Sequence, residues 1–220
     1  MVESFNPLDV NNIGVTLAVE LLEQDICPLP PAKFPGAGVY AIYYSGPHPA
    51  YAGIVCRDGG EGGLRYPIYI GSAARENAKQ GFNPSPTTEA RIWNRLKNHA
   101  ESIRSVVGCG EFDLREKDFH CRYLVLDDAY INLAESVLIA AFRPAWNGIG
   151  FGSKVVGKRR QEQVASLWDS LHPGRKGRPA GDLERRALAL KQMAESVEKV
   201  NSSREDPRVA RMVEKIRKFI

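Results

Sequence analysis

Residues 38–44 read GVYAIYY and residues 67–71 read PIYIG. β-branched and aromatic residues dominate both runs, which predicts two β-strands. The run GGEGG at 59–63 predicts a flexible loop between them. We therefore expect the two strands to form a hairpin that carries a long insertion at 47–66.

The sequence on either side of the hairpin predicts helices and one more strand. An amphipathic pattern predicts a helix at 11–24, and Pro28, Pro30, Pro31 and Pro35 predict an extended linker. The other expected elements are a helix at about 88–106 capped by Thr87 or Thr88, a strand at 119–126, a helix from Asp127 or Asp128 to about Phe142, and tail helices at about 160–171, 182–200 and 208–219. This order predicts an α/β (α+β) fold with a small, mainly antiparallel sheet flanked by helices.

Charge is distributed unevenly along the chain. The 220 residues are 43% hydrophobic and 25% charged, which excludes a mostly disordered or collagen-like protein, and the net charge is +4. Residues 151–220 contain 17 basic and 9 acidic side chains, a net of +8, whereas residues 1–150 carry a net of −4. A basic segment of this kind indicates either a nucleic-acid contact or a solvated helical tail.

The cysteines and the apolar segments indicate the compartment. The four cysteines form no C-x-x-C pair, and Cys109, His120 and Cys121 fit no standard zinc spacing. The first residues do not resemble a signal peptide, and no stretch approaches the ~20 apolar residues of a membrane span. We expect a bacterial cytoplasmic protein with reduced thiols and no membrane contact.

Two tyrosines on the predicted hairpin are candidate functional residues. Tyr40 follows Gly38 closely, and Tyr69 is followed by Gly71. A tyrosine on a strand ordinarily packs in the core. Glycine in a strand, however, often marks the close approach of a ligand or of another backbone.

Polar residues on the predicted helices are further candidates. Arg91, Arg95 and His99 follow an i, i+4, i+8 spacing, so a helix places them on one face. Glu135 lies among apolar or small neighbours, where a carboxylate is costly to bury without a partner. It either reaches the helix surface or holds a divalent metal. Asn147 could bind a phosphate or fix a loop.

Together these residues resemble the GIY-YIG nuclease family. Gly38-Val39-Tyr40 and Tyr69-Ile70-Gly71 are similar to its paired motif, with Val39 in place of isoleucine. Arg95 and His99, a helical Glu135, and Pro144-x-x-Asn147 follow in the family's order over about residues 36–148. The long gap between the tripeptides departs from the family pattern. The chain is most similar to type II restriction endonucleases, in particular to the branch that cuts CCGCGG.

The resemblance implies hydrolysis of a phosphodiester by water. Glu135 would hold one Mg²⁺, for which Mn²⁺ could substitute, and Arg95 would clamp the scissile phosphate. Tyr40 would orient or deprotonate the water, helped by His99 or Tyr69. Asn147 would position Tyr40 or the phosphate.

The resemblance also implies double-stranded DNA as partner and a homodimer on a palindromic site. Candidate DNA contacts come from the insertion, the loops and the basic tail: Arg57, Arg65, Arg75, Lys79, Arg91, Arg175, Lys176 and Arg178. We divide the chain into an N-terminal helix and linker (1–35), a nuclease domain (36–150) and a basic helical extension for DNA binding or dimerisation (151–220).

Three functions remain distinguishable by experiment. The first is a sequence-specific restriction nuclease. The second is a repair or homing nuclease of the same family, although those usually carry a further DNA-binding module. The third is a non-catalytic DNA-binding protein, which the joint presence of Tyr40, Arg95 and Glu135 disfavours.

Overall fold

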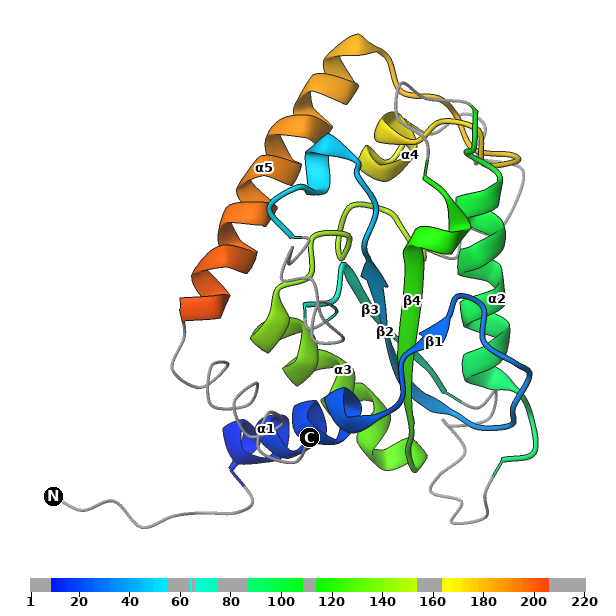
Figure 1. Ribbon diagram of the computed structural model, residues 1–220, viewed down its shortest axis with the longest axis vertical. Coiled ribbons are helices and arrows are strands. Elements are labelled where there is room, and N and C mark those ends of the chain that lie inside the picture. The colour runs from blue at the N-terminus through cyan, green and yellow to red at the C-terminus, as the bar shows by residue number, and fades with distance from the viewer. Residues whose placement is uncertain are drawn as a thin grey trace, which may run out of the picture.

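The computed structural model describes residues 9–54, 64, 66–74, 87–108, 114–153 and 164–205. Its strands are β1 (Cys27–Pro28), β2 (Gly38–Tyr44), β3 (Tyr69–Ala73) and β4 (Phe119–Val125). Its helices are α1 (Val10–Glu23), α2 (Arg91–Arg104), α3 (Asp128–Phe142), α4 (Leu167–Leu171) and α5 (Leu183–Glu205), with 3-10 turns η1 (Pro49–Tyr51) and η4 (Glu116–Asp118). The strands form one sheet in the order β1-β4-β2-β3, and all neighbours are antiparallel (Figure 1). The predicted fold class is confirmed.

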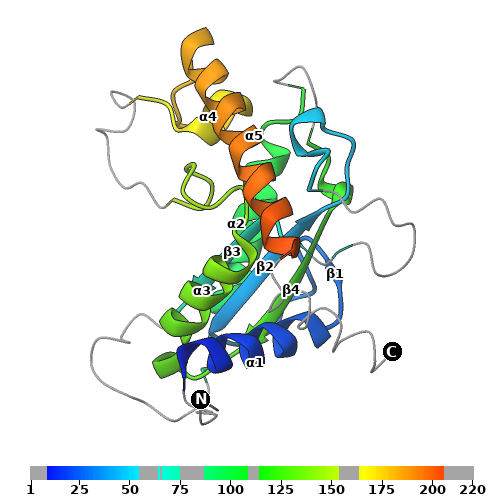
Figure 2. The same ribbon diagram turned by 90° about the vertical axis from the view of Figure 1, so that its left-hand side faces the viewer.

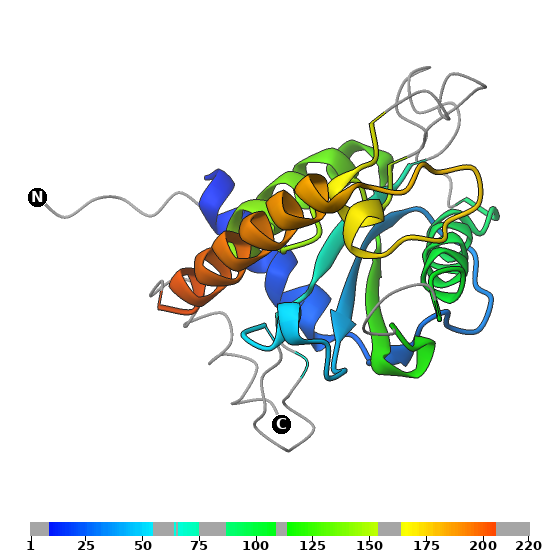
Figure 3. The same ribbon diagram turned by 90° about the horizontal axis from the view of Figure 1, so that it is seen from above.

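Strand β2 is the central element of the sheet. All seven of its residues are buried, because it pairs with β3 on one side and β4 on the other and is covered on both faces. Tyr40 and Ile42 face the cluster that contains Leu96 of α2. Val39 and Ala41 face the cluster formed with α1 and α3. Figure 3 shows α2 on one side of the sheet and α3 on the other.

Helix α2 begins differently from the prediction. Its N-cap is Ala90, and no side chain caps it, so neither Thr87 nor Thr88 has the predicted role. The oxygen of Gly36 accepts a hydrogen bond from Ile92 N at 3.1 Å, while Gly36 N donates to the oxygen of Glu89. The chain just before β2 therefore satisfies backbone groups at the start of the helix. Asp127 is the N-cap of α3, also without a side-chain bond.

The tail helices differ in length from the prediction. Helix α4 has only five residues, because Ser166 caps it, accepting a hydrogen bond from Asp169 N. Helix α5 continues through residues 201–203, where we predicted a break. Relative to Ala, Asn and Ser each cost a helix less than about 0.7 kcal/mol. This is too little to end a helix that packs against the protein along the rest of its length. The predicted helix at 208–219 lies outside the described residues.

The hydrophobic core continues past residue 150. Trp168 of α4 and Met193 of α5 belong to the same buried cluster as Tyr40 and Trp146. Figures 1 and 2 show α4 and α5 at the end of the sheet where β2 leads into η1. Residues 164–200 therefore pack as part of this core, and the division at residue 150 stays a prediction about function. Among the described residues, no helix is both long and apolar enough to cross a membrane.

Candidate active site

The six predicted catalytic residues gather around edge strand β3. Tyr40 comes from β2 and Tyr69 from β3 itself, while Arg95 and His99 lie on α2. The two remaining residues are Glu135 on α3 and Asn147 in the turn after α3. Because α2 and α3 cover opposite faces of the sheet, a site that uses both helices forms where the sheet ends.

Tyr40 and His99 form the buried centre of this group. The Tyr40 hydroxyl and His99 Nε2 are 2.8 Å apart and share a hydrogen bond. The two side chains are only 0% and 3% exposed. The Tyr69 ring lies 6.3 Å from the Tyr40 ring and 5.1 Å from the His99 ring, centre to centre. Of the two helpers that the resemblance implies for Tyr40, His99 therefore makes the short hydrogen bond.

Two glycines make room for the tyrosine hydroxyls. A Cβ atom at Gly71 would lie 2.5 Å from the hydroxyl of Tyr40, which pairs with Gly71 across the sheet. A Cβ atom at Gly152 would lie 2.2 Å from the Tyr69 hydroxyl, and Gly152 has a positive φ of 73°. The glycine flanking Tyr69 was expected to mark the approach of a ligand or another backbone, whereas here it makes room for a side-chain hydroxyl. The second was not predicted, because the sequence identified Gly152 only as part of a loop.

Arg95 lies at the border between this buried centre and solvent. One terminal nitrogen, Nη2, donates to the backbone oxygen of Gly152 at 3.0 Å, and the side chain is partly exposed. Its positive charge counteracts part of the rise that burial causes in the pKa of Tyr40 and of Tyr69. The same guanidinium also interacts with the hydroxyls of Tyr40 and Tyr69. Because it has five N–H donors, further donors remain for an anion such as phosphate.

Burial sets the protonation of the central pair. It raises the pKa of Tyr40 well above the value of a free phenol, and the neighbouring Tyr69 adds to the rise. Burial, followed by the charges of Arg95 and Arg175, lowers the pKa of His99 to about 3. At neutral pH the free protein therefore contains a neutral phenol bonded to a neutral imidazole.

We expect this neutral histidine to make stability depend on pH. Unfolded His99 binds a proton below pH ~6.5, whereas folded His99 does so only near pH 3, so its stabilising effect is complete above 6.5 and is lost as pH falls. Between pH 6.5 and 5.0, wild type should lose about 2 kcal/mol more unfolding free energy than His99→Gln. Urea titrations of both proteins at the two pH values measure this difference. Equal losses would show that His99 is not held neutral.

Glu135 is held by a serine that the sequence analysis did not single out. Its Oε2 atom accepts a hydrogen bond from Ser72 Oγ at 2.7 Å, and both side chains are partly exposed. Ser72 follows Gly71 on β3 and points to the opposite face from Tyr69, toward α3. Alternation along the strand could have identified it.

The side chains near Glu135 indicate which kind of metal ion the site could hold. Among the described residues, no three His, Cys, Asp or Glu side chains cluster as a metal site would require. Zinc, which takes three or four protein ligands, does not fit such a site. Magnesium fits, because it binds through one or two carboxylates and keeps several waters. A partly exposed carboxylate that a neighbouring hydroxyl orients is suited to that role.

Asn147 binds the backbone of β3. Its Oδ1 accepts from Ile70 N at 3.0 Å, and its Nδ2 donates to the oxygen of Ile70 at 2.8 Å. The side chain therefore pairs with Ile70 as a neighbouring strand would. Of the two uses that the sequence analysis left open, this contact corresponds to fixing a local backbone segment.

The remaining predicted positions are the DNA contacts. Arg57, Arg65, Arg75 and Lys79 lie outside the described residues. Arg91 forms an ion pair with Glu89, and Lys176 is exposed. Arg175 is 8% exposed and bonded to Asp169, while Arg178 donates to the oxygen of Ser153 at 2.8 Å. Arg175 is therefore mostly enclosed by the protein in this structure, and its assignment as a DNA contact stays a prediction.

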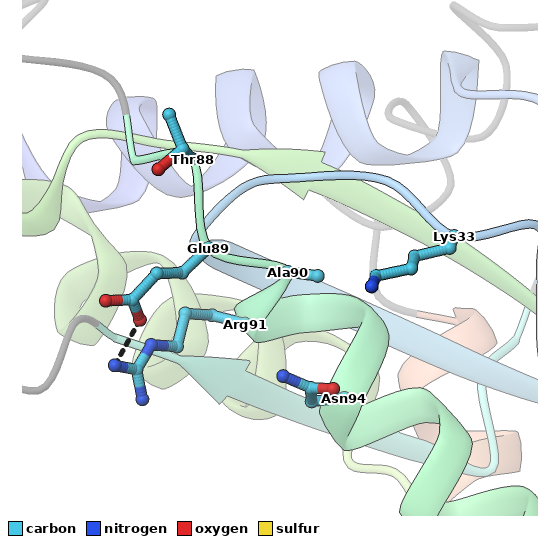
Figure 4. A pocket seen from close by; sticks show the side chains of 6 residues that line it. All are labelled: Lys33, Thr88, Glu89, Ala90, Arg91 and Asn94. Atoms are coloured by element: carbon cyan, nitrogen blue, oxygen red, sulfur yellow. Dashed lines mark ion pairs between the residues drawn. The ribbon is translucent and has the colours of Figure 1, made fainter.

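A hollow of about 560 Å³ lies at the first turn of α2, one turn before Arg95. Figure 4 shows the paired side chains of Glu89 and Arg91 together, with Lys33 on the other side of the hollow. Its lining residues are Lys33, Thr88, Glu89, Ala90, Arg91 and Asn94. None of the six candidate catalytic residues lines it, whereas Arg91, one of the predicted DNA contacts, does.

Comparison with known proteins agrees with this geometry. Residues 32–201 match the family model of the Eco29kI GIY-YIG domain, which spans most of the chain and includes α4 and most of α5. A comparison with curated proteins finds no match. The matched domain is that of a restriction endonuclease, whose substrate is DNA. The chain therefore belongs to the Eco29kI GIY-YIG family and is a restriction-type nuclease.

Proposed function

We propose that this protein is a type II restriction endonuclease that hydrolyses double-stranded DNA at a short GC-rich palindrome, CCGCGG, with one divalent metal per active site. The supporting observation is the arrangement around β3. A hydrogen-bonded Tyr40–His99 pair and Arg95 lie on one side of this edge strand, and the oriented carboxylate of Glu135 lies on the other. The buried Tyr40–His99 pair can accept and pass on a proton. The partly exposed Arg95 can bind a phosphate, and the partly exposed Glu135 can bind a metal ion.

Arg95 binds the scissile phosphate in this proposal. A guanidinium matches two phosphate oxygens and carries a full positive charge. As water attacks phosphorus, negative charge grows on the non-bridging oxygens, and the bond to the 3′ oxygen breaks. Arg95 opposes that charge in a partly buried position, where its effect exceeds that of an exposed cation.

Tyr40 orients the attacking water. In this proposal its hydroxyl is the donor in the hydrogen bond with His99 Nε2, which leaves its oxygen lone pairs to accept a hydrogen bond from the water. Because burial raises the pKa of Tyr40, the phenol is neutral when the substrate arrives. As the water loses its proton, Tyr40 can accept it while passing its own proton to His99, whose pKa the negative charge of the bound phosphate would raise from its low value in the free protein.

Glu135 holds the metal, with Ser72 fixing one of its oxygens. A bound Mg²⁺, or Mn²⁺ in its place, supplies positive charge to the phosphate and to the leaving oxygen. Asn147 takes no part in proton transfer. It holds Ile70, which lies between Tyr69 and Gly71, and so keeps this part of β3 in place.

Ser72→Ala tests how the carboxylate is oriented. We expect the variant to need about tenfold more Mg²⁺ for half-maximal cutting. Removing a residue that orients a metal ligand typically lowers metal affinity by about 10- to 100-fold, and we expect the low end of that range. Cleavage at saturating Mg²⁺ should fall much less. The measurement is the cleavage rate against Mg²⁺ concentration, with Ser102→Ala on the exposed part of α2 as control. An unchanged Mg²⁺ requirement would remove Ser72 from the site.

We further propose that two copies act on one palindrome, since a two-fold symmetric site and a cut in each strand call for a symmetric pair of active sites. The proposed DNA contacts include the exposed Lys176. They also include Arg57, Arg65, Arg75 and Lys79, which lie outside the described residues. Sedimentation of the protein with a CCGCGG duplex in Ca²⁺ should give two chains per duplex. One chain per duplex would contradict the dimer.

One digest tests the proposed function. A plasmid with a single CCGCGG site should become one linear band in Mg²⁺ and stay intact in EDTA. The same plasmid with CCGCGG changed to CCGAGG should stay intact in both. Discrete bands from cutting at another sequence would change the proposed target and leave the proposed restriction activity in place. Nicks only at lesions or branches would favour the repair or homing nuclease, and no cutting by folded protein would favour the non-catalytic one.

A further inference from the structure

The segment Ile149–Ser153 covers the buried half of the site. The Phe151 ring stacks on the His99 ring, with centres 4.7 Å apart and planes within 24°. It also meets the Tyr69 ring edge-on at 5.0 Å. The next residue, Gly152, supplies the backbone oxygen that accepts from Arg95. This segment thus touches three of the six candidate catalytic residues.

The segment contains no helix or strand, so its shape depends on what holds it. Gly150 and Gly152 have positive φ angles of 100° and 73°, which glycine adopts as readily as negative ones. A backbone with two such glycines can adopt many conformations of similar energy. A fixed position for Phe151 therefore requires contacts from outside the segment.

Helix α4 and the loop after it supply those contacts. Trp168 N donates to the oxygen of Ile149 at 2.9 Å, and Arg175 Nη2 donates to the oxygen of Gly150 at 3.3 Å. A Cβ atom at Gly150 would lie 2.3 Å from Ser166 Cβ, so segment and helix start are in close contact. The segment is thus packed between α4 and the catalytic side chains.

Arg175 is fixed in turn by Asp169. Their side chains are 7% and 2% exposed, and Arg175 bonds both carboxylate oxygens, at 2.5 and 2.7 Å. The guanidinium also lies 4.4 Å above the Trp168 ring. Burying two charges is costly, and a hydrophobic pair of similar volume is often as stable. We therefore explain the presence of this buried ion pair by the position it gives to the Arg175 guanidinium, and not by a gain in stability.

We infer that Asp169 and Arg175 are positioning residues for the nuclease site. Through the backbone of Gly150, the ion pair holds Phe151 against His99 and the Gly152 oxygen against Arg95. Its effect on cleavage rests on the proposed function, whereas its effect on His99 does not. The pair gives part of the basic tail a role inside the protein.

The test compares Asp169→Asn and Arg175→Lys with wild type. The control is Glu116→Gln, which breaks the partly exposed Arg104–Glu116 ion pair at the far end of α2. Circular dichroism establishes folding. Histidine-ring NMR then reports on Phe151, because a stacked aromatic ring displaces the resonances of the imidazole below it. We expect His99 resonances to move toward those of an unstacked imidazole in both variants and to stay unchanged in the control.

Cleavage gives the second measurement. In single-turnover reactions we expect both variants to cut at least about tenfold more slowly, because a misplacement of ~1 Å can cost about 100-fold. Affinity for the duplex in Ca²⁺ should change less than about twofold, since both side chains of the pair are buried.

Unmoved His99 resonances in folded Arg175→Lys, which retains the charge beside Asp169, would overturn the inference, even if Asp169→Asn fails to fold. Moved resonances with an unchanged cleavage rate would overturn the positioning role. If wild type cuts no DNA, the proposed function fails, and the NMR result alone decides whether the ion pair orders the segment.

Discussion

Glu135→Gln should abolish cleavage while DNA binding survives. We expect single-turnover cutting of a CCGCGG duplex in Mg²⁺ to fall by 1,000-fold or more, on the order of the largest losses seen when one group that stabilises transition-state charge is removed. The amide has nearly the shape of the carboxylate, and its oxygen can still accept the hydrogen bond from Ser72. The variant should therefore fold normally yet bind Mg²⁺ poorly, because a neutral amide is a weak ligand for a hard cation.

The matched control is Glu101→Gln, the same change on the exposed face of α2, where Glu101 only pairs with Lys97 across one helical turn. It should cut at the wild-type rate. Binding of each protein to the duplex is measured in Ca²⁺, with cleavage measured separately. Normal cutting by Glu135→Gln would show that the metal is held elsewhere, even if the rest of the site is correct.

Arg95→Lys should have the next largest effect, a fall of about 100- to 1,000-fold in the single-turnover rate. Lysine preserves the charge, so loss of activity would come from geometry. A guanidinium can donate to the Gly152 oxygen through one nitrogen and to a phosphate through others, whereas an ammonium offers one compact centre for both. The position of the phosphate relative to Tyr40 is therefore lost in the variant.

Arg104→Lys on the same helix is the control, since Arg104 pairs with Glu116 and touches no candidate catalytic residue. We expect it to cut as wild type does. Duplex affinity of Arg95→Lys should fall only a few-fold, because one phosphate contact is a small part of a DNA interface. If affinity falls as much as the rate, Arg95 acts in binding and not in the transition state.

Much of the fold could be predicted because its signals are local. The apolar run at 38–44 is buried on both faces, and this burial accounts for its uninterrupted β-branched and aromatic composition. The i, i+4 spacing of Arg95 and His99 places them on one helix face whatever packs against it. The six motif residues were identified from their order along the chain. The structure brings them together around β3, and their catalytic roles stay predictions.

The parts that were missed depend on contacts between distant segments. No local pattern shows that Gly36 would satisfy the start of α2, or that Ser72 would meet a carboxylate 63 positions away. The sequence does not indicate the buried ion pair of Arg175, because a cation in a basic loop with glycines is equally typical of a DNA contact. Its carboxylate partner is only six residues away, but the burial of both depends on Trp168 and the segment before α4.

The bond between Asn147 and Ile70 also bears on self-association. An edge strand with unpaired backbone groups is a template on which another chain can add a strand and begin to aggregate. At β3 the amide of Asn147 occupies both backbone groups of Ile70, and Trp146 N occupies the oxygen of Ile68 at 2.9 Å. An incoming strand would find those positions taken. The edge beside Tyr69 is thus protected from strand addition at Ile68 and Ile70.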